Sequence, residues 1–131
     1  MLPFIESRAR SFQHAFAGFW FVIRTQRNAW IHATASVVVV VLAFWLGLSS
    51  GDWAIIIIAI TMVWIAEFIN TALEAVVDLA SKQEQHEMAK IGKDVGAAAV
   101  LIAAASAALI GFLILGPPLW ERIQMLVSTN P

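Results

Sequence analysis

Five polar residues in one apolar stretch have the spacing of a single helix face. Their positions follow i, i+3, i+4, i+7 and i+11, and they are Glu67, Asn70, Thr71, Glu74 and Asp78. At about 100° per residue they fall within an arc of about 100°. An ionisable side chain inside hydrocarbon costs at least about 2.5 kcal/mol, so this stripe is expected to face protein or water. Three carboxylates on one face also repel each other, which predicts a bound cation, and the oxygen ligands suit Mg²⁺.

The depth of the stripe indicates which reaction it serves. Counted from Trp53 at about 1.5 Å per residue, Glu67 lies about 21 Å deep and Glu74 about 31 Å deep in a hydrocarbon layer of about 30 Å. One substrate in the bilayer and one in water would explain this gradient. Phosphoryl transfer to a lipid hydroxyl fits, with Glu67 accepting the hydroxyl proton, Glu74 holding Mg²⁺ on nucleotide phosphates, and Lys93 neutralising the transferred group. The alternative is structural: Asn70 and Thr71 join helices, and the outer carboxylates belong to a solvated helix end.

The composition is that of a membrane protein. Of the 131 residues, 60% are hydrophobic and 13% are charged, whereas soluble domains have about 45 to 50% apolar and about 25% charged residues. The length predicts one domain, residues 1–131. A formal net charge of -1 disfavours nucleic acid as a partner, and the absence of cysteine excludes thiolate chemistry. The polar N-terminal stretch lacks the apolar core of a cleavable signal peptide, so we expect it to be retained.

Three apolar runs predict three membrane-spanning helices at about 29–48, 53–80 and 95–116, each near the length needed to cross a bilayer. A tight turn at 49–52 joins the first two, and Pro117 and Pro118 are expected to end the third. Before them, apolar residues recur with helical spacing within about 4–25, which predicts an amphipathic helix on the membrane surface. A fourth, short buried helix is the alternative. The fold class is therefore all-α.

The distribution of basic residues predicts the orientation. Seven of the eight Lys and Arg residues precede the first span or lie between the second and third, and only Arg122 follows the third. The positive-inside rule then places the N-terminus and the long second loop in the cytoplasm.

Further polar residues fall at the depth of the stripe. Gln26, Asn28 and His32 begin the first span, and Lys93 and Asp94 begin the third. If the preceding loop is helical, His86 and Lys90 share a face with Lys93, and such cations attract phosphate. No phosphate-binding glycine loop occurs in the sequence, so side chains on helices are expected to hold the nucleotide.

These residues resemble a known family. The segment 67–78 (EFINTALEAVVD), followed by His86, segment 89–94 (AKIGKD) and segment 97–101 (AAAVL), is similar to the prokaryotic diacylglycerol kinase and undecaprenol kinase family. Segment 11–18 (SFQHAFAG), then 24–28 (RTQRN) and His32, resembles the N-terminal region of that family. The resemblance covers about residues 10–116.

The resemblance implies a homotrimer of three-span subunits in the bacterial inner membrane, with active sites shared between neighbouring subunits at the cytoplasmic interface, and with ATP and Mg²⁺ as reactants. By motif, Glu67 matches the general base, Asn70 a polar active-site residue, and Glu74 a metal-binding carboxylate. Nucleotide-site positions of the family fall on His14, Asp78, His86, Lys93 and Asp94.

Gln26 departs from the family pattern, which usually has a metal-binding glutamate at this position. An amide ligates Mg²⁺ more weakly, so we expect weaker metal binding, a substitute ligand or impaired activity. The substrate stays open between undecaprenol and diacylglycerol, because pocket shape discriminates poorly between apolar chains. The Arg-Thr-x-Arg-Asn pattern at 24–28 is more similar to undecaprenol kinases.

Two other classes of function remain. In a proton- or cation-coupled transporter, Glu67 would be the coupling site, although such sites usually lie nearer the midplane or between repeats. In a non-catalytic assembly protein, Gln26 would mark a degenerate site.

Overall fold

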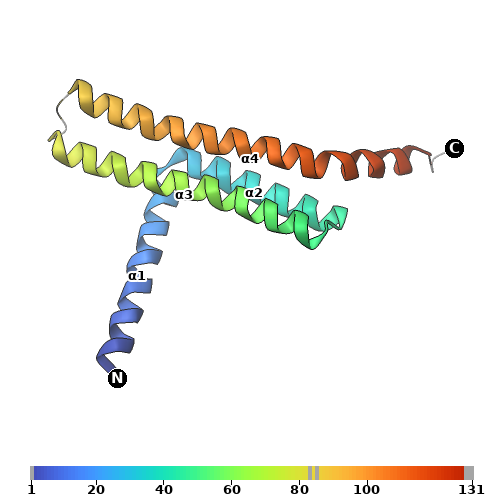
Figure 1. Ribbon diagram of the computed structural model, residues 1–131. Coiled ribbons are helices and arrows are strands. Elements are labelled where there is room, and N and C mark those ends of the chain that lie inside the picture. Colours follow the sequence, from blue (N-terminus) through green and yellow to red (C-terminus); the bar gives the residue numbers. More distant parts are fainter. Residues whose placement is uncertain (1, 83, 85, 129–131) are drawn as a thin grey trace.

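The computed structural model describes residues 2–82, 84 and 86–128, with side chains from residue 7 onward. This part of the chain forms four helices, α1 (Leu2–Thr25), α2 (Arg27–Leu46), α3 (Ser50–Ala80) and α4 (Glu87–Ser128). α2, α3 and α4 lie side by side, and α1 runs away from them, across the bundle axis (Figure 1). The predicted all-α fold is confirmed.

The hairpin between α2 and α3 is shorter than expected. Gly47 ends α2 with a φ of 68°, a left-handed conformation that glycine adopts without steric cost. The Ser49 hydroxyl accepts a hydrogen bond from the backbone N–H of Asp52 at 3.2 Å and donates one to the Asp52 carboxylate at 2.6 Å. This N-cap starts α3 at Ser50, so residues 50–52 belong to the helix and not to the predicted turn.

Glycine residues of α4 allow α3 and α4 to approach closely. A Cβ atom added at Gly92 would meet Val77 of α3 at 3.5 Å, and Gly96 lies directly against Asn70 of α3. Ala59 and Val63 of α3 and Ala103 of α4 are buried. Many large apolar side chains stay exposed, such as Ile58 at 66%, Leu101 at 70% and Phe112 at 73%. Three helices, α2 to α4, are long and apolar enough to cross a membrane. This pattern is typical of helices whose outer faces contact lipid.

The expected end of the third apolar helix at Pro117 was wrong. α4 contains both prolines and continues to Ser128. The ring fixes φ near -65°, which is compatible with a helix, so each proline removes a hydrogen bond without reversing the chain. Residues beyond the prolines also have contacts to α2, since the Arg122 guanidinium lies 5.6 Å from the Trp45 ring centroid.

α1 is a helix as predicted, and within the described chain it is not buried against the other three helices. The described side chains before Val22 are exposed, with Phe12 at 65% and Phe16 at 73%. Contact with the bundle comes from Phe19, whose ring centroid lies 6.0 Å from that of Trp64 and 5.6 Å from that of Phe68, both on α3. α1 therefore presents its apolar face outside the bundle, where a membrane surface would meet it.

Candidate functional site

Glu67 is the innermost residue of the polar stripe. It is fully buried on α3, and neither carboxylate oxygen has a hydrogen-bond partner among the described residues. Across the helix interface, Nε2 of His32 on α2 lies 3.6 Å from Oε2 of Glu67. A buried carboxylate without donors is unfavourable. Such a group is suited to accept a hydrogen bond or a proton from an incoming ligand.

The next turn of the stripe joins α3 to the start of α2. Glu74 accepts a hydrogen bond at each oxygen, from Nδ2 of Asn70 at 3.0 Å and from Nε2 of Gln26 at 3.2 Å. Gln26 is the N-cap residue of α2, which brings its side chain to α3. The structure thus brings together the two residues expected to bind metal, with Gln26 acting as an N–H donor.

Two further stripe residues are buried by packing. Oδ1 of Asn70 has no hydrogen-bond partner in the described structure, and Gly96 of α4 lies directly against it, with no room for a Cβ atom. Thr71 donates to the backbone oxygen of Glu67 at 2.9 Å. Its hydroxyl is therefore used within α3 and does not join two helices, contrary to what the structural alternative had expected.

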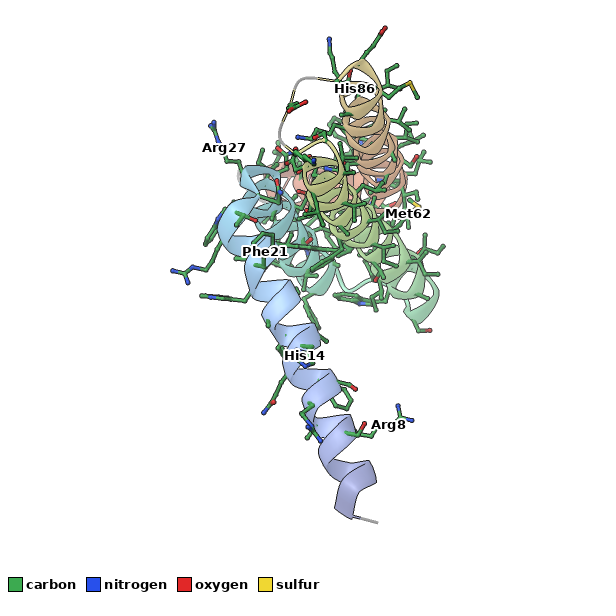
Figure 2. The ribbon with its side chains drawn as sticks, turned by 90° about the vertical axis from the view of Figure 1, so that its left-hand side faces the viewer. Arg8, His14, Phe21, Arg27, Met62 and His86 are labelled. Atoms are coloured by element: carbon green, nitrogen blue, oxygen red, sulfur yellow. The ribbon has the colours of Figure 1, made fainter. Side chains whose placement is uncertain are left out.

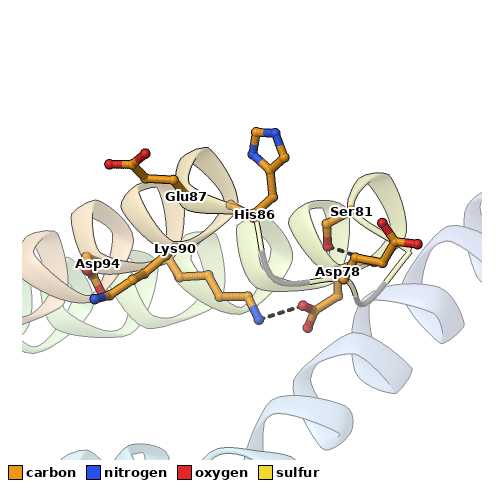
Figure 3. Close-up of a pocket in the computed structure, with 9 residues that line it drawn as sticks. Asp78, Ser81, His86, Glu87, Lys90 and Asp94 are labelled. Carbon is orange, nitrogen blue, oxygen red and sulfur yellow. Dashed lines mark hydrogen bonds and ion pairs between the residues drawn. The ribbon is translucent and has the colours of Figure 1, made fainter.

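At the outer end of the stripe, residues at the C-terminal end of α3, Glu84, His86 and the first turns of α4 line an open pocket of about 850 Å³. Figure 3 shows its lining, and Lys93 forms an ion pair with Asp78 at 2.5 Å. Both side chains are only part-buried, so the pair contributes little stability and can exchange partners. The pocket is lined by Asp78, Ser81, Glu84, His86, Glu87, Ala89, Lys90, Lys93 and Asp94.

Four of the predicted nucleotide-site residues therefore meet in one pocket: Asp78, His86, Lys93 and Asp94. His86 also has a structural role, since its Nδ1 accepts the backbone N–H of Met88 at 3.2 Å at the start of α4. His14 is not brought to this pocket by the chain. It lies midway along α1, away from the bundle (Figure 2).

The sequence interpretation assigned no role to His32 and did not place Glu84 and Glu87 in the pocket. The signal for His32 was its depth, since it begins the first span at the level of the stripe. With Glu84 and Glu87, the described lining holds four carboxylates against two lysines. A polyphosphate in this pocket would therefore need an additional cation.

The residues present fit Mg²⁺ only together with a ligand. The described residues contain no group of three or more His, Asp or Glu side chains that could hold a metal ion. Glu74 offers one carboxylate, and the amides of Gln26 and Asn70 stand beside it. Mg²⁺ is commonly held by one or two carboxylates with waters and substrate phosphates completing the shell. The site thus suits a metal that arrives with a nucleotide.

Fold and site together define a small helical membrane protein with several spans. A stripe of polar residues on α3 connects its buried carboxylate with a charged pocket. The sequence profile of prokaryotic diacylglycerol kinase matches residues 13–115. The chain belongs to this family of lipid kinases.

Individual relatives support this assignment. The chain is 45% identical over 109 residues to a diacylglycerol kinase of Synechocystis, covering 83% of this chain and 62% of the relative. It is 40% identical over 110 residues to the undecaprenol kinase of Bacillus subtilis, covering 84% of this chain and 89% of the relative. A diacylglycerol kinase of Escherichia coli is 39% identical over 84 residues, covering 59% of this chain and 68% of the relative.

Proposed function

We propose that this protein transfers the terminal phosphate of ATP to the hydroxyl group of a membrane lipid, with Mg²⁺, at the cytoplasmic face of a bacterial inner membrane. One observation carries the proposal. The stripe on α3 runs from the buried, unpartnered Glu67 to the part-buried Asp78 in the charged pocket. An apolar substrate and a nucleotide can meet along such a stripe.

Glu67 is the proposed general base. Its carboxylate oxygens lack donors, so they are available to accept the proton of a lipid hydroxyl. Asn70, one turn further along α3, donates to Glu74 and so holds the carboxylate that is the proposed metal ligand. Phosphoryl transfer depends mainly on such positioning of the groups around the phosphates.

Glu74 is the proposed ligand of Mg²⁺, with the Gln26 amide beside it. When bound, the metal would neutralise charge on the phosphates of the nucleotide. Gln26 now donates its N–H to Glu74, and a metal ligand must present oxygen, so the amide has to turn over for Gln26 to take part. This supports weaker metal binding than a second carboxylate would give.

The pocket between α3 and α4 is the proposed nucleotide site. Lys93 would exchange its ion pair with Asp78 for the terminal phosphate, and His86 and Asp94 line the same space. His14 does not reach this pocket within one chain. A homotrimer with sites shared between subunits, as the family resemblance implies, would let α1 of a neighbour supply it.

The lipid is an alcohol such as undecaprenol or diacylglycerol. Both names occur among the relatives. The 24–28 pattern, Arg-Thr-Gln-Arg-Asn, favours undecaprenol. The excess of basic residues before α2 and between α3 and α4 supports a cytoplasmic N-terminus.

The test is a lipid phosphorylation assay with labelled ATP. Purified protein in micelles of undecaprenol or of diacylglycerol should label the lipid only with Mg²⁺ present. Glu67→Gln keeps the size of the side chain and removes the base, and should lower kcat by about 100-fold or more. Glu121→Gln, at the exposed far end of α4, is the matched control and should keep full activity.

Other results of these assays would favour a different class of protein. Proton or cation flux in vesicles that depends on Glu67, without labelled lipid, would favour the transporter. Neither flux nor labelled lipid with either alcohol would favour the assembly protein.

A further inference from the structure

His32 and Glu67 face each other across the interface of α2 and α3 without completing a hydrogen bond. The side chains are 13% and 1% exposed, and their nearest polar atoms, Nε2 and Oε2, are 3.6 Å apart. A good N–H···O hydrogen bond has a length of about 2.9 Å. Neither atom has another partner among the described residues. Among the described residues, each of these two buried atoms is therefore the nearest hydrogen-bond partner that the other could have.

Contacts with Trp64 of α3 hold the His32 ring in place. It meets the Trp64 ring edge-on, with centroids 6.5 Å apart and an interplanar angle of 70°. Nε1 of Trp64 donates to Oγ of Ser36 at 3.3 Å, and that hydroxyl donates to the backbone oxygen of His32 at 2.7 Å. The backbone and ring of His32 are thus both tied to α3 beside Glu67.

The other polar side chains of the stripe are engaged elsewhere. Asn70 directs its N–H to Glu74, and Thr71 directs its hydroxyl to the α3 backbone. Among the described residues, the side chain left to orient Glu67 is therefore His32.

We propose that His32 is a positioning residue for Glu67. Its Nε2–H donates to Oε2 of Glu67 and leaves Oε1 directed at the lipid hydroxyl. This inference rests on the proposed role of Glu67 as the base. A small rotation of either side chain closes the gap when substrate binds, since catalytic hydrogen bonds are often long without it.

Two substitutions separate positioning from packing. His32→Phe keeps a ring against Trp64 but removes the N–H, and it should lower kcat by about 100-fold, the cost of misplacing a reacting group by about 1 Å. KM for ATP should not change. His32→Gln loses the ring but keeps an N–H donor, and it should retain most of the activity. Thr34→Val, on the exposed side of α2, is the control and should behave as wild type.

Two results for these variants would overturn the inference. If His32→Phe keeps wild-type kcat, the N–H is not needed. If His32→Gln loses as much activity as His32→Phe, a donor N–H at this position is not sufficient for activity, and the positioning role is refuted.

A measurement without turnover keeps this inference distinct from the proposed function. The carboxylate stretch of Glu67 is isolated as the infrared difference between wild type and Glu67→Gln. Recorded with the lipid bound and ATP absent, so that the hydrogen bond is closed, this band should shift in His32→Phe and stay in place in His32→Gln. Failure of the wild type to phosphorylate either lipid would refute the proposed function alone, whereas an unshifted band in His32→Phe would refute the His32–Glu67 contact.

Discussion

Gly96 of α4 packs directly against the side-chain amide of Asn70 on α3, and a methyl group at position 96 would overlap Oδ1 of Asn70. The close approach of the two helices at the site therefore depends on a missing side chain. Because Asn70 in turn donates to Glu74, this packing contact and the stripe are coupled.

Gly96→Ala should accordingly disturb both stability and activity. Overpacking costs about 1 to 3 kcal/mol, and a displaced Asn70 releases Glu74. Unfolding in mixed detergent and the lipid phosphorylation assay measure the two effects. The control is Gly111→Ala on the same helix, where an added Cβ has no neighbour within 4 Å. It should be neutral or stabilising, by up to about 1 kcal/mol. Equal stability of the two variants would contradict the packing argument.

Gln26→Glu should strengthen metal binding. It places a second carboxylate beside Glu74, and an added ligand charge near a divalent ion should lower the Mg²⁺ concentration for half-maximal activity by about tenfold. Without metal the two carboxylates repel each other, so the variant should melt below wild type in EDTA and recover when Mg²⁺ and nucleotide are added.

Asn28→Asp is the control for added charge. It adds the same charge at the same end of α2, but on an exposed residue. An unchanged Mg²⁺ requirement in Gln26→Glu, or an equal change in Asn28→Asp, would argue against a metal at Glu74.

Lys93→Met should impair catalysis without unfolding the protein. The part-exposed ion pair with Asp78 is worth less than about 1 kcal/mol, so thermal stability should hardly change. Loss of the cation should raise KM for ATP and lower kcat if Lys93 contacts the terminal phosphate. Lys82→Met removes an exposed lysine that does not line the pocket, and it should be active. Full activity of Lys93→Met would place the phosphates elsewhere.

Phe19→Ala should loosen α1 from the bundle. The ring of Phe19 packs on Trp64 and Phe68, and aromatic pairs contribute about 0.5 to 1.5 kcal/mol each beyond burial. A spin label at exposed position 15 should become more mobile. Phe12→Ala removes an exposed ring of the same helix and should leave the label unchanged. The same mobility in both variants would show that Phe19 does not anchor α1.

Spacing alone was sufficient to predict the stripe on α3, because five residues of one helix share a face whatever surrounds them. The contact between His32 and Glu67 was beyond that reasoning. It depends on the rotation of α2, which is apolar on nearly all sides and so carries no periodic signal for the face it turns to α3. Depth in the membrane placed the two residues at one level, but not facing each other.

The prolines of α4 and the amide of Gln26 are two further features that local sequence patterns did not predict correctly. Local preference predicted a helix end at Pro117, but the φ of a proline is compatible with a helix, and α4 continues to Ser128 beside α2. The sequence showed an amide where the family has a carboxylate, but not that this amide would bond to Glu74.

The length of α3 has a consequence for how the two substrates meet. Its 31 residues extend over about 46 Å, well beyond a hydrocarbon layer of about 30 Å. Glu67 and Asp78 are separated by eleven positions, or about 16 Å along the axis. In the proposed reaction, α3 therefore sets the distance between the nucleotide pocket and the base. A nucleotide bound in the pocket must lie lengthwise along the helix for its terminal phosphate to approach the lipid, and Lys93 must turn from Asp78 toward Glu74 to stay in contact with that phosphate. A shorter polyphosphate would not reach the lipid.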